Sequence, residues 1–172
     1  MSLQVAYVAL GSNLGDRDAH LQFAVLALAD LDGVEPTMCS PVYETDPMGP
    51  ANQPAYLNAV VALETSRTPA ALLEAMLDIE ERAGRFRQLD TPRWSSRSLD
   101  LDLLLFGDRS LDEPNLKIPH PGLAERAFVL VPLADLAPGL VHPVRGETVS
   151  SLLRSVPRAG VRPWRRCLRI TR

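Results

Sequence analysis

The chain is short of lysine, of cysteine and of long apolar runs. Lys117 is the only lysine among the 172 residues, so the positive charge is carried almost wholly by arginine. The cysteines, Cys39 and Cys167, fit neither a metal-binding spacing nor a disulfide framework, which predicts reduced thiols and a cytoplasmic location. No apolar run is long enough to cross a membrane and no signal peptide precedes the first predicted strand, so no membrane partner is expected.

Common signatures of nucleotide and nucleic-acid binding are missing as well. The turn GSNLG at residues 11–15 has neither the Walker lysine nor the G-x-G-x-x-G pattern, so a structural turn is favoured over a phosphate loop. No RNP pattern is present and the net charge is −3, which argues against the alternative of an RNA-binding module, and no nucleic-acid partner is expected. From Ser151 onward there are seven arginines and no acids. We interpret the basic tail, from about residue 144, as a solvated terminus, with nucleotide or nucleic-acid contact as the alternative.

The distribution of apolar residues predicts a single α+β domain over residues 1–172. Alternating or continuous apolar stretches predict strands at 5–10, 34–44, 56–65 and 97–106. Helical spacing and capping residues predict helices at 16–31, 68–83 and 122–136, the last either in two pieces or kinked at Pro132, and a short helix at 149–156. This order predicts a ferredoxin-like βαββαβ sandwich, a four-stranded antiparallel sheet with helices on one face and a helical C-terminal extension.

Two aspartates lie close together on the strand predicted at residues 97–106. Strand periodicity places Asp100 and Asp102 on one face, roughly 7 Å apart along the strand. Strands avoid aspartate, and two like charges repel unless a positive group lies between them. Mg²⁺ is often held by one or two carboxylates together with substrate phosphates. The pair is therefore either a metal platform or an acidic solvent face, and the strand alone does not decide between them.

Arginines precede this strand closely. Residues 85–97 contain four of them, Arg85, Arg87, Arg93 and Arg97. A guanidinium group can donate two parallel hydrogen bonds to the oxygens of one phosphate, and it stays charged at any working pH. Arginines closing over phosphates held by a metal on the aspartates would supply what phosphoryl transfer requires. The alternative is that the arginines form structural ion pairs with nearby acids.

A set of short motifs, in order, closely resembles a known family across nearly the whole chain, up to about residue 143. They are GSNLG (11–15), YET (43–45), MGP (48–50), QPAYLN (53–58), RWSSRSLDLD (93–102), IPHP (118–121) and RAFVL (126–130). Together they resemble 6-hydroxymethyl-7,8-dihydropterin pyrophosphokinase, an enzyme of folate biosynthesis. The resemblance implies transfer of the diphosphate of ATP to the hydroxymethyl group of the pterin, with release of AMP.

The resemblance also implies residue roles, a cofactor and partners. It implies two Mg²⁺ ions on Asp100 and Asp102, with ATP as co-substrate, and a monomer whose partners are small molecules. The implied catalytic residues are Arg85, Arg97, Asp100 and Asp102. The implied ATP contacts are Glu80, Arg87, Trp94, Leu103, His120 and Arg126. The implied pterin contacts are Thr45, Met48, Tyr56, Asn58 and Phe128, with the pterin between the two aromatic rings.

Some positions depart from the family pattern. Asp46 stands where proline is common, Pro121 where an aromatic residue is common, and Ser95 where glycine or alanine is usual. The arginine-rich stretch is also a residue or two longer than expected. These departures bear on loop conformation more than on the reaction. The residues assign no general base, and a hydrolytic two-metal phosphodiesterase, a further alternative, would need more metal ligands than Asp100, Asp102 and His120.

Overall fold

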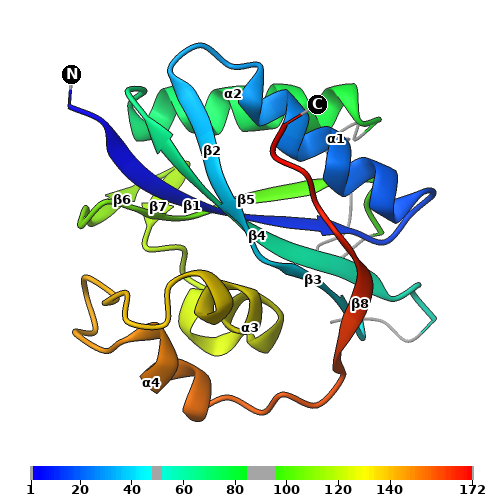
Figure 1. Ribbon diagram of the computed structural model, residues 1–172. Helices are drawn as coiled ribbons and strands as arrows, with labels where there is room; N and C mark the ends of the chain where they lie inside the picture. Colours follow the sequence, from blue (N-terminus) through cyan, green and yellow to red (C-terminus); the bar gives the residue numbers. More distant parts are fainter. Residues whose placement is uncertain (1, 48–51, 85–95, 172) are drawn as a thin grey trace.

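The protein is built on one antiparallel sheet covered by helices on both faces (Figure 1). The computed structural model describes residues 2–47, 52–84 and 96–171, with the backbone alone at 165 and 166. Six strands form the sheet in the order β5-β1-β4-β3-β8, with β2 also paired to β4. These strands are β1 (Gln4–Ser12), β2 (Val34–Cys39), β3 (Pro41–Thr45), β4 (Tyr56–Thr65), β5 (Asp100–Phe106) and β8 (Val161–Cys167).

Two helices cover one face of the sheet and the C-terminal helices cover the other (Figure 1). The first face carries α1 (Arg17–Ala29) and α2 (Pro69–Arg82). The second carries the 3-10 turn η1 (Leu123–Glu125) and the helices α3 (Ala127–Leu136) and α4 (Val149–Arg154). A small hairpin, β6 (Leu111–Glu113) and β7 (Leu116–Ile118), follows β5.

The helix starts agree with the capping residues in the sequence. The side chains of Asp16 and Thr68 each accept a backbone N–H from the first turn of α1 and α2, and Pro69 opens α2. After α2, Gly84 adopts a φ of +86°, which ends the helix at low steric cost. Both predicted helices and their caps are confirmed.

Strand β4 separates the two hydrophobic cores. Its residues Leu57, Ala59 and Val61 belong to the core under α1 and α2. Val60 belongs to the core under α3 and α4. This is the alternation that period-two spacing predicts, and it leaves Asn58 on the α3 side of the sheet.

A side-chain contact holds α3 to the sheet. The Tyr43 hydroxyl on β3 donates to the Asp135 carboxylate at 2.6 Å. Burial, together with this carboxylate, raises the pKa of Tyr43 to about 12, so the phenol stays a donor at neutral pH.

The predicted single strand at 34–44 is in fact two strands, which was a wrong boundary. Pro41 has no backbone N–H to donate to a neighbouring strand, and the strand is interrupted just before it, at Ser40. The Ser40 amide donates to the Val60 carbonyl at 2.9 Å, and its hydroxyl accepts the Val60 amide at 2.9 Å. The serine hydroxyl therefore supplies the acceptor for the Val60 amide at the point where the ladder is interrupted.

The four-stranded sheet and the solvated tail are the other corrections. The sheet has six strands because the second predicted strand is split and β8 is added at the edge beside β3. The expectation of a solvated terminus is wrong, since β8 is paired with β3 and Val149, Leu152 and Leu153 of α4 are buried. Their i, i+3, i+4 spacing is a helical core pattern, which the surrounding arginines obscured.

The predicted helix at 122–136 is two pieces, one of the two alternatives. The break falls at Arg126, whose φ of −112° and ψ of 106° are extended, and Pro132 lies inside α3 without ending it. Within the described ranges, no helix is long and apolar enough to span a membrane.

Candidate active site

A pocket lies on the α3 side of the sheet, at the end where β1 and β3 finish and β4 and β5 begin. The predicted site residues that line it are Thr45, Tyr56, Asn58, Arg97, Asp100, Asp102, His120, Arg126 and Phe128. The remaining lining residues are Ala9, Leu10, Gly11, Asp46 and Val129. Side chains that the sequence analysis assigned to ATP, metal and pterin therefore share one pocket.

Strand register places Gly11 at the centre of the pocket floor. Gly11 on β1 is paired with Asn58 on β4 and with Asp100 on β5. A Cβ on Gly11 would lie 3.2 Å from Asn58 Oδ1 and 3.9 Å from Asp100 Cβ. The missing side chain therefore leaves space between an amide and a carboxylate. The sequence pattern predicts Gly11 only as part of a turn, because the strand register that brings it beside Asn58 and Asp100 joins distant residues.

The two aspartates form the anionic centre of the pocket. Arg97 Nη1 donates to Asp100 Oδ2 at 2.7 Å, and His120 Nε2 lies 3.8 Å from Asp102 Oδ1. Burial raises the pKa of Asp102 and the neighbouring Asp100 raises it further, against the opposing effects of His120, Arg126 and Arg97. A half-buried carboxylate beside another is stabilised by a cation.

Both carboxylates therefore offer the hard oxygen ligands that Mg²⁺ prefers. Among the described residues, no group of three or more His, Cys, Asp or Glu side chains is placed to hold a metal ion. A cation bound to these two carboxylates therefore needs further ligands, which substrate phosphates and water can supply. Asp100 and Asp102 fit Mg²⁺ when its coordination is completed in this way.

His120 is held in place by backbone contacts on both sides. Its Nδ1 accepts the Gly122 amide at 3.1 Å, so in the neutral ring the proton lies on Nε2, which faces Asp102. Its own amide donates to the Leu104 carbonyl at 2.9 Å. Burial lowers the pKa of His120, partly offset by Asp102, so the neutral form is favoured.

Arg126 reaches the pocket because Gly122 has no side chain. A Cβ on Gly122 would lie 2.4 Å from Arg126 Nε and 2.5 Å from its Cζ. The guanidinium also lies over the Phe128 ring, 5.8 Å from the ring centroid. Gly122 therefore shapes the position of a pocket cation that the sequence analysis identified by resemblance.

The other part of the pocket combines aromatic rings with a buried amide. Tyr56 contributes from β4 and Phe128 from α3. Asn58 Nδ2 donates to Thr45 Oγ1 at 2.6 Å, and both residues are buried. A flat heterocycle with polar edges suits such a slot, since rings supply contact area and a fixed amide supplies direction.

Two predicted ATP contacts lie outside this pocket. Glu80 on α2 is 1% exposed, and its Oε1 accepts the Leu101 amide at 2.7 Å, between the two aspartates. The Leu103 side chain belongs to the core under α1 and α2. The structure thus links Glu80 to the aspartate strand, and the contact of either residue with ATP stays a prediction.

Asn13 is a residue whose role the sequence analysis missed. Its Oδ1 accepts the Arg97 amide at 2.7 Å and its own amide donates to the Arg97 carbonyl at 3.0 Å. Its Nδ2 donates to the Pro54 carbonyl at 3.2 Å and to Ser96 Oγ at 3.3 Å. Asn13 thereby fixes the segments that lead into Arg97 and Tyr56. A polar side chain inside the GSNLG motif was the available signal.

Four predicted site residues fall outside the described part of the chain. They are Met48, Arg85, Arg87 and Trp94. Their assigned roles stay predictions, as does the effect of Ser95.

Comparison with known proteins places the chain in a family. The family described as 7,8-dihydro-6-hydroxymethylpterin-pyrophosphokinase (HPPK) matches residues 7–138. The chain belongs to the HPPK family. A 2-amino-4-hydroxy-6-hydroxymethyldihydropteridine pyrophosphokinase of Pseudomonas aeruginosa is 47% identical over 159 residues, 92% of this chain and 96% of that protein. The Synechocystis protein of the same name is 43% identical over 158 residues, 92% of this chain and 79% of that protein.

Solved structures show the same fold at low sequence identity. A crystal structure of a Plasmodium falciparum HPPK-DHPS variant matches with a TM-score of 0.69 at 18% identity and covers 90% of this chain. This chain spans 45% of that longer protein. The mixed α/β architecture with an antiparallel sheet is thus the HPPK fold, and the resemblance found in the motifs is confirmed.

Proposed function

We propose that the protein transfers the β,γ-diphosphate of ATP to the hydroxymethyl group of 6-hydroxymethyl-7,8-dihydropterin and releases AMP. One observation carries the proposal. The Asp100–Asp102 pair, with Arg97, His120 and Arg126, shares a single pocket with a slot lined by two aromatic rings and a buried amide. A donor of phosphates and a flat heterocyclic acceptor can therefore be held side by side.

The acceptor is assigned to the slot around Asn58. Tyr56 and Phe128 supply ring faces for stacking, and the Asn58 amide, fixed by Thr45, meets the polar edge of the heterocycle. Because Gly11 separates Asn58 from Asp100, the hydroxymethyl end of the pterin would point toward the aspartates. The relatives are named as pyrophosphokinases of a hydroxymethyldihydropteridine, a flat heterocycle that would suit such a slot.

The triphosphate is assigned to the charged half of the pocket. Bound at Asp100 and Asp102, Mg²⁺ would compensate phosphate charge and help orient the triphosphate. Arg97 and Arg126 supply guanidinium groups, and the Nε2–H of His120 supplies a neutral donor. Positioning and charge stabilisation account for most of the catalysis in phosphoryl transfer, where a loose transition state needs little help from a base. We assign no general base.

Several finer features belong to the same proposal. We infer two Mg²⁺ ions, a monomer and a cytoplasmic location. The ferredoxin-like plan is supported by the antiparallel order β5-β1-β4 and by the helices α1 and α2 on one face.

The direct test is product analysis. Purified protein is incubated with ATP, Mg²⁺ and 6-hydroxymethyl-7,8-dihydropterin, and nucleotides are separated by anion exchange. We expect AMP and pterin diphosphate in equal amounts, with neither formed when Mg²⁺ or the pterin is left out. Formation of ADP, or no consumption of ATP, would show that the proposal is wrong.

A further inference from the structure

We propose that Gly160 and Arg162, just before and within the start of β8, position the Thr45–Asp46 rim of the pterin slot. The inference rests on the proposed function for the identity of the ligand, and on the contacts below for the mechanism. It assigns a role in substrate binding to a segment that lies beyond residues 7–138, where the family match ends.

The backbone of β8 is paired with the last residues of β3. Thr45 is in register with Val161 and Glu44 with Arg162. One residue further, the Asp46 amide donates to the Gly160 carbonyl at 3.1 Å. The pairing therefore continues to the point where β3 meets the pocket, since Thr45 and Asp46 both line it.

Gly160 permits this close approach. Its φ is +79°, a conformation that favours glycine. A Cβ at this position would lie 2.6 Å from Asp46 Oδ2 and 3.1 Å from Asp46 Cγ. Glycine at 160 and aspartate at 46 are thus matched to each other.

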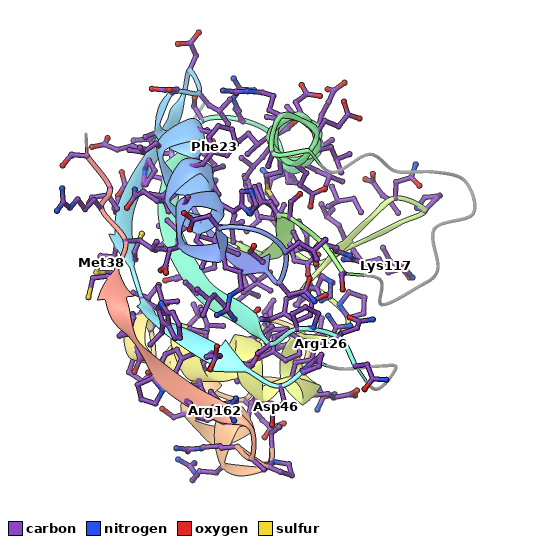
Figure 2. The ribbon with its side chains drawn as sticks, turned by 90° about the vertical axis from the view of Figure 1, so that its right-hand side faces the viewer. Phe23, Met38, Asp46, Lys117, Arg126 and Arg162 are labelled. Atoms are coloured by element: carbon purple, nitrogen blue, oxygen red, sulfur yellow. The ribbon has the colours of Figure 1, made fainter. Side chains whose placement is uncertain are left out.

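Asp46 is one of the departures from the family pattern, which commonly has proline there. A proline could neither donate an amide to Gly160 nor accept a hydrogen bond from Arg162. In this chain, Arg162 Nη2 donates to Asp46 Oδ1 at 2.8 Å, and the two side chains meet beside the β3–β8 edge of the sheet (Figure 2). Asp46 therefore makes two contacts with residues 160–162, one through its amide and one through its carboxylate.

A network of ion pairs and hydrogen bonds connects Arg162 to Ala55, the last residue before β4. Glu44 lies between two arginines, with Oε2 3.8 Å from Arg162 Nη2 and Oε1 3.0 Å from Arg17 Nη1. Arg17 Nη1 also donates to the Ala55 carbonyl at 2.7 Å, immediately before Tyr56. The network thus holds Asp46 at one end of the segment between β3 and β4 and Ala55 at the other.

Trp164 of β8 supports the same network. Its Nε1 donates to the carboxylate of Asp18, at 3.1 Å and 3.2 Å from the two oxygens. The Arg17 guanidinium lies over its ring, 5.2 Å from the centroid. β8 therefore fixes Arg17 from one side while Glu44 fixes it from the other.

Thr45 connects the end of β3 to the pterin slot. Thr45 accepts the Asn58 amide at 2.6 Å, and Tyr56 follows Ala55 directly. A shift of the β3 end would thus move the group that orients Asn58, whereas the Asp100–Asp102 centre lies across Gly11 on β5. Arg162 is a positioning residue by this argument, and its loss should affect the pterin more than ATP.

The test compares three variants of the full-length protein, namely Arg162→Gln, Arg162→Lys and the control Arg158→Gln. Arg158 has an exposed side chain in the same C-terminal segment, so its variant makes the same charge change away from the rim. For Arg162→Gln we expect the KM for the pterin to rise about five-fold, with kcat and the KM for ATP unchanged. Arg162→Lys should recover part of the loss, and Arg158→Gln should match wild type.

Hydrogen exchange at the Asp46 amide gives a second readout that needs no substrate. This amide should exchange faster in Arg162→Gln than in wild type or Arg158→Gln, because its bond to Gly160 is loosened. Unchanged exchange, or equal increases in the KM for pterin and ATP, would overturn the inference. If wild type makes no AMP, the proposed function fails, while the exchange result still decides whether Arg162 positions the rim.

Discussion

Gly11, Ala9 and Gly122 have little or no side chain, and each borders a charged group of the pocket. Gly11 is paired with Asp100 and Ala9 with Asp102, while Gly122 lies against the Arg126 guanidinium. Small residues at these positions leave the charged groups room to reach a ligand. The site thus depends on side-chain volume at its borders as well as on its charges.

The variant Gly122→Ala tests this dependence at one position. Gly122 has a φ of −88°, which alanine accepts, but its new Cβ would meet the movable end of Arg126. We expect Arg126 to be displaced and the KM for ATP to rise about tenfold, through loss of a charge-assisted contact. Stability, measured by urea unfolding, should change by less than about 0.5 kcal/mol.

A matched control is Gly139→Ala, since a Cβ there meets no atom within 4 Å. This control should leave both the KM for ATP and the unfolding midpoint as in wild type. An unchanged KM in Gly122→Ala would show that Arg126 does not act on ATP from its position in the pocket.

The sequence predicted the roles of some pocket residues and not of others. Period-two spacing placed Asp100 and Asp102 on one face, and both line the pocket. His120 and Arg126 came from the family resemblance, because no local pattern marks a residue brought to a site by tertiary structure. Gly11 and Asn13 were missed in their site roles, since strand register and contacts between distant segments decide those roles.

At the scale of elements, β5 is an edge strand whose backbone also bonds to groups outside the sheet. Glu80 of α2 accepts the Leu101 amide, and the Leu104 carbonyl accepts the His120 amide. Leu104 is the extra residue of a bulge, because Tyr7 pairs with Leu105 and Val8 with Leu103. Its contact with His120 lies close to Asp102, which His120 Nε2 faces.

Variants of Glu80 test the link between α2 and β5. Glu80→Ala leaves the buried Leu101 amide without this acceptor, and we expect a loss of about 1–3 kcal/mol in unfolding free energy. Because the aspartates flank Leu101, kcat should fall by about 100-fold with the altered geometry. Glu80→Gln retains an acceptor and should lose much less of both.

The control for this pair is Glu81→Ala, the exposed neighbour on the same helix. It should change stability by no more than about 0.5 kcal/mol. Wild-type kcat in Glu80→Ala would contradict a positioning role for this contact.

Elements were predictable where local signals were strong. The caps Asp16 and Thr68 marked two helices, and alternation marked β4, because these signals are local. The bulge in β5 and the short hairpin β6–β7 were not predicted, since each depends on pairing partners rather than on its own sequence. The division of the predicted strand 34–44 was also missed, since the hydrogen bond between the Ser40 hydroxyl and the Val60 amide joins residues 20 apart in the chain.

At the scale of the whole molecule, the C-terminal segment completes both the sheet and the second core. β8 adds an edge strand beside β3, and α4 packs with α3 over the face that carries the pocket. Its basic composition favoured a solvated tail in the sequence analysis. Three apolar residues and one strand pairing decide otherwise, which charge composition does not reveal.

Leu152→Ala tests whether this segment is part of the folded core. Leu152 is 2% exposed, so its truncation should cost about 2–5 kcal/mol in unfolding free energy. Val144→Ala, at a residue that is 65% exposed, is the matched surface control and should stay within about 0.5 kcal/mol of wild type. Equal stabilities of the two variants in urea unfolding would restore the interpretation as a solvated terminus.

The central claim is that Asp100 and Asp102 hold the metal that holds the triphosphate. Calorimetric titration of wild type and Asp102→Asn with an ATP analogue carrying a methylene bridge between Pα and Pβ, with and without Mg²⁺, tests it most directly. Because burial and Asp100 raise the pKa of Asp102, asparagine should preserve or improve stability, so the variant stays folded. We predict Mg²⁺-dependent binding in wild type and a loss of about 100-fold or more in affinity in Asp102→Asn. Binding of equal affinity in both proteins, or binding that does not require Mg²⁺, would contradict the account.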